Sequence, residues 1–257
     1  LKKAIQEKLK LYQPGKEYAI QWKSDTIQST PLLFKGYAAK FKPSEVSGQP
    51  RLYYDRNEPF EKKINFYDTY LPTVHITIPS YYVIPQSEWK TIEHLERNKI
   101  EMKRLQKDSL ISVNGYKIEN FSTVKAPYEG HYLHFDTQVS SFTENIKFRK
   151  GDYLVSTKQN GVKYLLETLE PMATDSFFNW NFYDAILGQK EYYSPYVFED
   201  TAAQLLLENT QLKANFEKKK SEDAQFAKDG KAQLDWVYKN SPYFESTFRR
   251  YPIFRIQ

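Results

Sequence analysis

The sequence predicts an α+β fold, in which a mostly antiparallel β-sheet part with one β-α-β insertion is followed by a helical C-terminal subdomain. Three observations support this. Strand-like segments recur from residue 18 to residue 157. A single helical segment interrupts them near residue 90. From about residue 161 onward, apolar residues recur three and four positions apart, as on one face of a helix. We therefore predict a sheet-rich part over residues 1–160 and a helical part over residues 161–257, packed together as one unit.

The strands of the first part are indicated by alternating apolar and polar residues. The clearest case is Thr73–Ile78, where Val74, Ile76 and Ile78 alternate with threonine and histidine. This period of two is typical of a half-buried strand. Breaks that contain Gly or Pro separate the other predicted strands, which are Tyr18–Trp22, Leu32–Phe41, Arg51–Tyr54, Lys62–Phe66, Leu110–Ile118, His131–Val139, Ile146–Arg149 and Tyr153–Ser156.

The β-α-β unit is predicted over Tyr82–Leu105. A short apolar run ends at Pro85, and Gln86–Asn98 then has helical spacing with Ser87 as a candidate N-cap. A second strand follows the helix, with Ile100 near its start. A right-handed crossover makes the two strands of such a unit parallel.

The remaining helices lie at the two ends of the chain. Leu1–Leu11 has an amphipathic helical pattern, and a chain that begins inside such a pattern is expected to be cut from a longer protein. The helices predicted near the C-terminus are Gly161–Leu169, Thr201–Glu208, Gln211–Lys220 and Ala232–Lys239. The final segment, Tyr243–Ile256, is so apolar that we expect it to be docked on the protein.

Between the two parts lies an aromatic segment, Leu169–Asp200. Its rings are Phe177, Phe178, Trp180, Phe182, Tyr183, Tyr192, Tyr193, Tyr196 and Phe198. Burying a ring removes a large apolar area from water, so these rings cannot all be solvated without cost. We predict an irregular segment that joins the sheet-rich part to the helical part. Its rings either form core or present a recognition surface, for which Asn179, Trp180, Asn181, Asp184 and Tyr196 are the candidate binding or interface residues.

The bulk composition is that of a soluble globular protein, with 40% hydrophobic and 27% charged residues. The net charge of +5 comes from 37 basic and 32 acidic residues that are mixed along the chain, so we expect no nucleic-acid partner. No run of about 18 apolar residues occurs, and we therefore expect no membrane span. The absence of cysteine excludes disulfides and thiol catalysis.

The sequence contains no recognisable catalytic or metal-binding motif. The 4 histidines are His75, His94, His131 and His134. None has a Glu three residues later, and His131 and His134 would point to opposite faces of a strand, so we expect no metal ligand among them. No nucleophile elbow, phosphate loop or dinucleotide-binding motif occurs. We therefore assign no catalytic residue.

Three long stretches carry a resemblance to a known family. They are YYVIPQSEWKTIEHLERNKIEMKRL (Tyr81–Leu105), KYLLETLEPMATDSFFNWNFYDAILGQKEYYSPYVFED (Lys163–Asp200) and LDWVYKNSPYFESTFRRYPIFRI (Leu234–Ile256). They resemble the C-terminal region of large bacterial zinc carboxypeptidases of the metallocarboxypeptidase family. In that family a peptidase domain comes first and holds zinc through an HxxE motif and a later His. The present chain has no HxxE, so none of the family's catalytic or metal residues is carried over to it.

The resemblance implies a non-catalytic accessory region that packs on its own N-terminal peptidase domain and shapes the access of a peptide substrate. Zinc is expected in that catalytic domain and no cofactor in this segment, and the family implies a periplasmic or extracellular location. A second hypothesis is a stand-alone module that binds peptide or glycan through exposed aromatic rings. A third is an enzyme that uses Glu170, Asp175 and Asp184.

Overall fold

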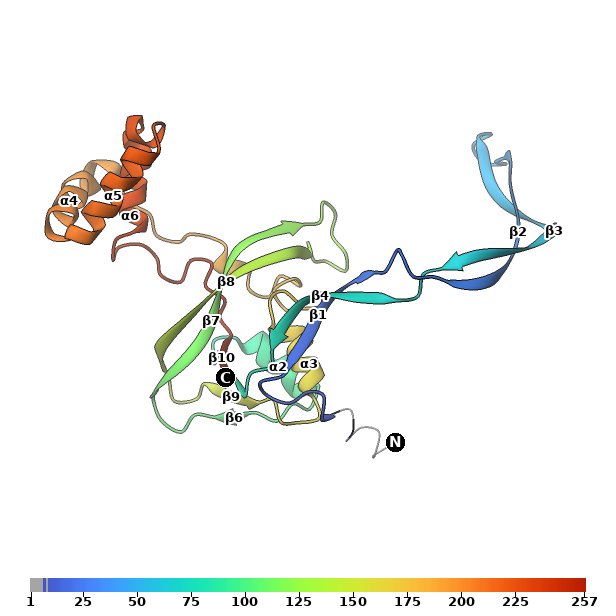
Figure 1. Cartoon of the computed structure of the whole chain (residues 1–257), viewed down its shortest axis with the longest axis horizontal. Coiled ribbons are helices and arrows are strands. Elements are labelled where there is room, and N and C mark those ends of the chain that lie inside the picture. The colour runs from blue at the N-terminus through green and yellow to red at the C-terminus, as the bar shows by residue number, and fades with distance from the viewer. Residues whose placement is uncertain (1–6, 8) are drawn as a thin grey trace. The chain divides into compact units, whose positions relative to one another are not determined.

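The computed structural model describes residue 7 and residues 9–257, and it has the α+β architecture that the sequence predicts (Figure 1). The predicted helix at Leu1–Leu11 lies largely outside the described residues. The described residues form two compact units, one made of residues 17–77 and the other of residues 7, 9–16 and 78–257. The expected boundary near residue 160 therefore falls inside the larger unit. Within the described residues, every helix is too short or too polar to traverse a bilayer.

The smaller unit consists of two antiparallel strand pairs. Strands β1 (Glu17–Ser24) and β4 (Tyr70–Thr77) form one pair, and β2 (Thr30–Pro43) and β3 (Pro50–Phe66) form the other. The sequence predicted two strands within β3, whereas the structure has one continuous strand that absorbs the irregularity as a bulge opposite Tyr37 and Ala38. Figure 1 shows β2 and β3 as a long, twisted two-stranded ribbon.

The larger unit contains a six-stranded sheet with the order β6-β9-β5-β10-β7-β8. Its strands are β5 (Tyr81–Ile84), β6 (Lys103–Arg104), β7 (Ser109–Thr123), β8 (His134–Phe148), β9 (Tyr153–Ser156) and β10 (Phe254–Ile256). The last strand, β10, pairs antiparallel with both β5 and β7. The expectation that the apolar C-terminus is docked is thus confirmed, since it completes the centre of the sheet.

The predicted β-α-β unit is present as β5, α2 (Trp89–Arg97) and β6. Both strands pair antiparallel with β9, so they run in the same direction with β9 between them. The prediction of Ser87 as the N-cap was wrong. Its hydroxyl donates to the Glu88 carboxylate over 3.0 Å, and the cap residue Glu88 makes no side-chain cap bond.

Helix α3 (Val162–Leu169) follows β9, and its apolar residues are buried almost completely. The amide of Asn98, just after α2, donates to the hydroxyl of Tyr164 on α3 over 3.1 Å. At the end of α3, the fully buried Glu170 forms an ion pair with Arg255 of β10, with 3.2 Å between Oε1 and Nε. The hydroxyl of Tyr82 in β5 donates to the same carboxylate over 2.6 Å. This network links α3 to two neighbouring strands.

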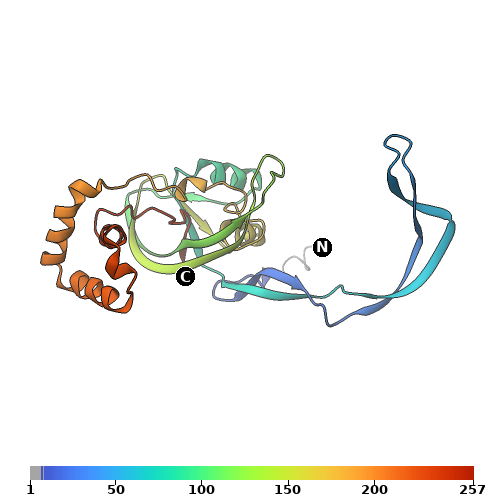
Figure 2. The ribbon, with the colours of Figure 1, turned by 90° about the horizontal axis from the view of Figure 1, so that it is seen from above.

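The helical part contains α4 (Pro195–Glu208), α5 (Thr210–Glu222) and α6 (Gly230–Lys239), the orange to red helices of Figure 2, and these helices share a common core. That core is formed by Phe198, Ala202, Phe216, Phe226, Val237 and Tyr238. The carboxamide of Asn209 accepts from the N–H of Leu212, and the carboxylate of Asp229 accepts from the N–H of Ala232, each over 2.9 Å. Both side chains are N-caps, which explains why α5 and α6 begin close to the predicted Gln211 and Ala232. Helix α4 begins earlier than predicted, at Pro195 instead of Thr201.

Candidate functional site

The aromatic segment is irregular, as predicted, and contains only turns and a short 3₁₀ helix, η1 (Asp184–Ile186), before α4 begins. Its rings divide between core and surface. Phe177, Phe178, Tyr183 and Phe198 are buried, Trp180, Phe182 and Tyr193 are half-buried, and Tyr192 and Tyr196 are exposed. The two readings of these rings as core or as surface therefore apply to different residues of the same segment.

Asn179 fixes the turn from which the half-buried rings project. This side chain is buried, and its amide donates to the carbonyls of Ala173 and Thr174 over 2.9 and 3.2 Å. Its Oδ1 accepts from the hydroxyl of Thr137 in β8 over 3.0 Å. Because all these bonds are internal, Asn179 holds the loop on the sheet and is not itself open to a ligand.

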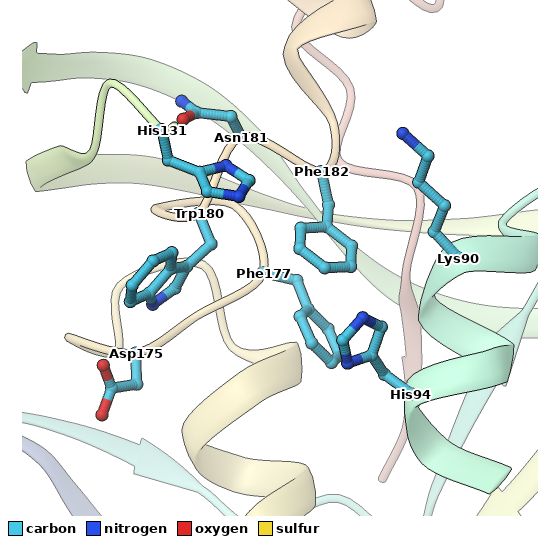
Figure 3. Close-up of a pocket in the computed structure, with 8 residues that line it drawn as sticks. All are labelled: Lys90, His94, His131, Asp175, Phe177, Trp180, Asn181 and Phe182. Atoms are coloured by element: carbon cyan, nitrogen blue, oxygen red, sulfur yellow. The ribbon is translucent and has the colours of Figure 1, made fainter. Parts of the chain in front are cut away.

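Trp180, Asn181 and Phe182, which follow Asn179 in the chain, line a pocket of about 470 Å³ (Figure 3). Its wall is made of Lys90, His94, His131, Asp175, Phe177, Trp180, Asn181 and Phe182. The candidate residues Trp180 and Asn181 are thus placed in one pocket, whereas Asp184 and Tyr196 do not line it. Tyr196 lies on α4 and is 90% exposed.

The aromatic wall of the pocket is rigidly packed. Phe177 and Phe182 stack with ring centroids 4.7 Å apart, and the edge of His94 on α2 lies against both, at 5.7 and 5.2 Å. On the other side, the ring of His131 meets Trp180 edge-on at 5.5 Å. Such edge-to-face contacts fix ring orientation, so the pocket is largely preformed.

Asn181 has a left-handed backbone with φ of 65°, a conformation that asparagine tolerates better than most residues. Its amide donates to the carbonyl of Tyr132 over 2.8 Å, which leaves the carboxamide oxygen without a partner in the part of the chain that the structure describes. Two exposed charged residues, Lys90 and Asp175, lie on opposite sides of the pocket in Figure 3. The pocket therefore combines an apolar wall with polar groups of both signs.

His131 and His134, which sequence spacing placed on opposite faces of a strand, do have different surroundings. The strand begins only at His134, because a turn with Glu129 and Gly130 at positive φ folds the chain back before it. His131 lines the pocket, whereas the buried ring of His134 packs against Phe121 and Phe178. The described residues contain no group of three His, Asp or Glu side chains that could hold a metal ion.

Asp184 belongs to a second polar group beside the pocket. His134 Nε2 lies 3.1 Å from Asp184 Oδ1, and His134 Nδ1 lies 2.9 Å from the hydroxyl of Thr123. The amide nitrogen of Asn181 lies 3.2 Å from the same Nε2. If Nε2 carries the proton, it donates to Asp184, Nδ1 accepts from Thr123, and the Asn181 amide donates to the Tyr132 carbonyl alone. Bulges in the β7–β8 pairing near Asn120 bring Thr123 opposite His134.

The acids of the enzyme hypothesis are not gathered in one cavity. Glu170 is buried against Arg255, Asp184 contacts His134, and only Asp175 lines the pocket. The sequence pattern does not mark Lys90, His94 or His131 as pocket residues. Lys90 and His94 share a helix face at a spacing of four, which is a signal available from sequence, but their proximity to Trp180 depends on tertiary packing.

Comparisons of the chain with protein-family models, with curated protein sequences and with solved structures find no match.

Proposed function

We propose that this chain is a non-catalytic accessory region of a zinc carboxypeptidase-like peptidase, and that it contributes to substrate access by binding peptide in the pocket around Trp180. The accessory role, the zinc-bearing peptidase domain as partner and a periplasmic or extracellular location rest on the resemblance of the three long stretches. The peptide-binding role rests on one structural observation, the preformed aromatic pocket with a charge of each sign on opposite sides.

A peptide fits the chemistry of this pocket. An apolar side chain would lie against Phe177, Phe182 and Trp180, where its burial supplies the main favourable free energy. The free oxygen of Asn181 can accept a backbone N–H. Lys90 and Asp175 would interact with a carboxylate and an ammonium group, which sets orientation more than affinity because both side chains are exposed.

A second candidate is a stand-alone module for glycan. The observation in its favour is that the half-buried Trp180 lies in the same pocket as Asp175 and Asn181. A planar ring beside acceptors for hydroxyl groups also suits a sugar. The two candidates share a site and differ in ligand, so one experiment separates them.

The experiment is calorimetric titration of the chain with the tripeptide Ala-Leu-Phe and, separately, with cellotetraose. We expect the tripeptide to bind and Trp180→Ala to weaken binding about ten-fold or more, because loss of a central aromatic anchor typically costs about 2 kcal/mol. Trp22→Ala is the matched control, since Trp22 is 56% exposed on β1 and does not line the pocket. If cellotetraose binds and the tripeptide does not, the glycan-binding candidate is supported and the peptide-binding proposal is overturned.

The non-catalytic role has a separate test. The chain is incubated with zinc and a peptide that carries a C-terminal phenylalanine, and free phenylalanine is quantified. We expect no release above the rate without protein. Release that is abolished by a chelator would overturn the accessory role while leaving the binding result intact.

A further inference from the structure

The helical part carries another hollow, whose lining includes four tyrosines. Tyr192 and Tyr193 precede α4, Tyr238 belongs to α6, and Tyr243 follows α6. Together with neighbouring residues they enclose about 450 Å³. None of these residues lines the pocket around Trp180, so this tyrosine groove is a distinct feature.

The rings of the groove form an inner and an outer layer. Tyr238 is buried, and it lies 5.6 Å from the buried Phe198 in an edge-to-face arrangement. Tyr193 packs on Tyr238 at 4.6 Å, and Tyr192 stacks on Tyr193 at 4.6 Å. Tyr192 and Tyr243 are 59% and 58% exposed. The inner rings therefore fix the outer ones, whose surfaces are open to solvent.

Several acidic side chains lie at or near the groove. Glu191 is part of its lining, and the hydroxyl of Tyr192 lies 3.4 Å from the carboxylate of Asp235. Burial, the contact with Tyr192, and then the charges of Asp235 and Glu199 together raise the pKa of Tyr193. Burial is the largest of these causes, and the carboxylates of Asp235 and Glu199 add negative charge near the groove, which favours a cation.

The nearby lysines neutralise only some of the carboxylates around the groove. Lys239 pairs with Asp235 over 2.6 Å, and Lys190 pairs with Glu245 over 3.2 Å. Among the described residues, Glu191 and Glu199 form no ion pair, and no lysine or arginine lies over the four tyrosine rings. The groove thus combines open aromatic faces with uncompensated negative charge.

We propose that the tyrosine groove binds an organic cation, namely the ammonium or guanidinium group of a basic side chain. The negative face of an aromatic ring attracts a cation, and the attraction strengthens where the cation is partly desolvated. Tyr192 and Tyr243 provide the accessible rings, and Glu191 provides the counter-charge at the lining. This proposal does not depend on the peptide pocket around Trp180.

The test is to titrate the chain with N-acetyl-lysine amide and with N-acetyl-arginine amide. Binding is monitored through the chemical shifts of the tyrosine ring signals in NMR spectra. The neutral counterparts are the Nε-acetylated lysine derivative and the citrulline derivative, which keep the length and lose the charge. We expect the cations to bind at least about five-fold more tightly than the neutral compounds. Equal binding of charged and neutral probes, or no binding of either, would overturn the proposal. Tetramethylammonium tests whether the positive charge alone suffices.

Matched variants locate the site. Tyr192→Leu and Tyr243→Leu keep apolar bulk and remove the ring, and each should weaken cation binding several-fold. Tyr196→Leu is the control, because Tyr196 is 90% exposed on α4 and does not line the groove. Glu191→Gln should weaken binding, whereas Glu217→Gln on the exposed surface of α5 should not. Circular dichroism of each variant checks that the helices are retained, and weakening by the control variants alone would place the cation elsewhere.

Discussion

The six-stranded sheet and the β2–β3 ribbon are built from similar residues and end in opposite environments. In the sheet, Val83, Ile84 and Val155 are fully buried. In the ribbon no residue is buried, and Leu32, Phe34 and Phe60 are 40–46% exposed. Each ribbon strand has one neighbour, whereas β5, β9, β10 and β7 have neighbours on both sides. Alternating apolar residues therefore predict a strand, and the topology decides whether that strand becomes core.

The same contrast holds for ion pairs. Glu170 and Arg255 in the larger unit are buried, with side chains 0% and 9% exposed. Lys35 and Glu61 on the ribbon form a 2.8 Å pair with side chains 70% and 56% exposed. Solvent weakens the exposed pair, and the buried pair leaves an uncompensated charge when one partner is removed.

The largest predicted effect follows from this difference. Arg255→Met should lower the free energy of unfolding of the larger unit by about 3–5 kcal/mol, because the Glu170 carboxylate would lose its cation inside the protein. Lys35→Met should cost about 1 kcal/mol or less. Urea unfolding measured by far-UV circular dichroism compares the two variants.

A double variant tests the cause. Glu170→Gln combined with Arg255→Met removes both charges, and it should recover part of the stability that Arg255→Met loses. No recovery would mean that Arg255 acts through its packing on Tyr116, whose ring centroid lies 5.1 Å from the guanidinium, rather than through its charge.

Much of the fold was available from sequence because its signals are local. The alternation around Val74, the helical spacing in α2 and the caps Asn209 and Asp229 act within a few residues. The role of Arg255 was not available, since its partner Glu170 lies 85 positions earlier and both look like surface residues in isolation. The sequence offers Glu170 as a catalytic acid, and only the fold shows that it is buried against Arg255.

The candidate site was predictable to a similar extent. Trp180 is a candidate because tryptophan and tyrosine anchor interfaces, and Asn181 is a candidate because it flanks Trp180. Asn179 was named for the same reason, yet its side chain faces inward and holds the turn. Neighbouring residues in an irregular loop have no fixed period, so sequence alone could not separate the inward amide from the outward one.

A smaller effect is predicted at two glycines that are covered by a phenylalanine on the opposite strand. Gly36 pairs with Phe60 in the ribbon, and Gly115 pairs with Phe142 in the sheet. A Cβ at Gly36 would lie 2.8 Å from the Phe60 ring, and one at Gly115 would lie 2.3 Å from the Phe142 ring. Phe142 packs against the sheet core and lies under the guanidinium of Arg250, whereas Phe60 is 40% exposed and can turn away.

Gly115→Ala should therefore destabilise the larger unit by about 1–3 kcal/mol, as expected for overpacking. Gly36→Ala should change the stability of the ribbon by less, since the ring of Phe60 can yield. Hydrogen exchange of the backbone amides next to each glycine measures the change in stability separately for the ribbon and for the larger unit. Equal losses at the two positions would show that Phe60 is held as firmly as Phe142, against its exposure.

The smallest predicted effect is a loss of stability at low pH. Two carboxylates that accept backbone N–H groups, one in each unit, have a lowered pKa. On the ribbon, the N–H of Asn57 and then Lys40 lower the pKa of Asp55. In the larger unit, the N–H of Lys190 lowers the pKa of Glu245 from 4.5 to about 2. A carboxyl group whose pKa is lowered by folding stabilises the folded state at pH values above its pKa in the unfolded chain. This stability is lost as the pH falls from about 4.5 towards 2.

The melting temperature of the helical part should therefore fall across this pH range. Glu245→Gln should make that fall shallower, whereas Glu217→Gln should not. An unchanged pH dependence in Glu245→Gln would show that protonation of other carboxylates controls the acid sensitivity of this unit.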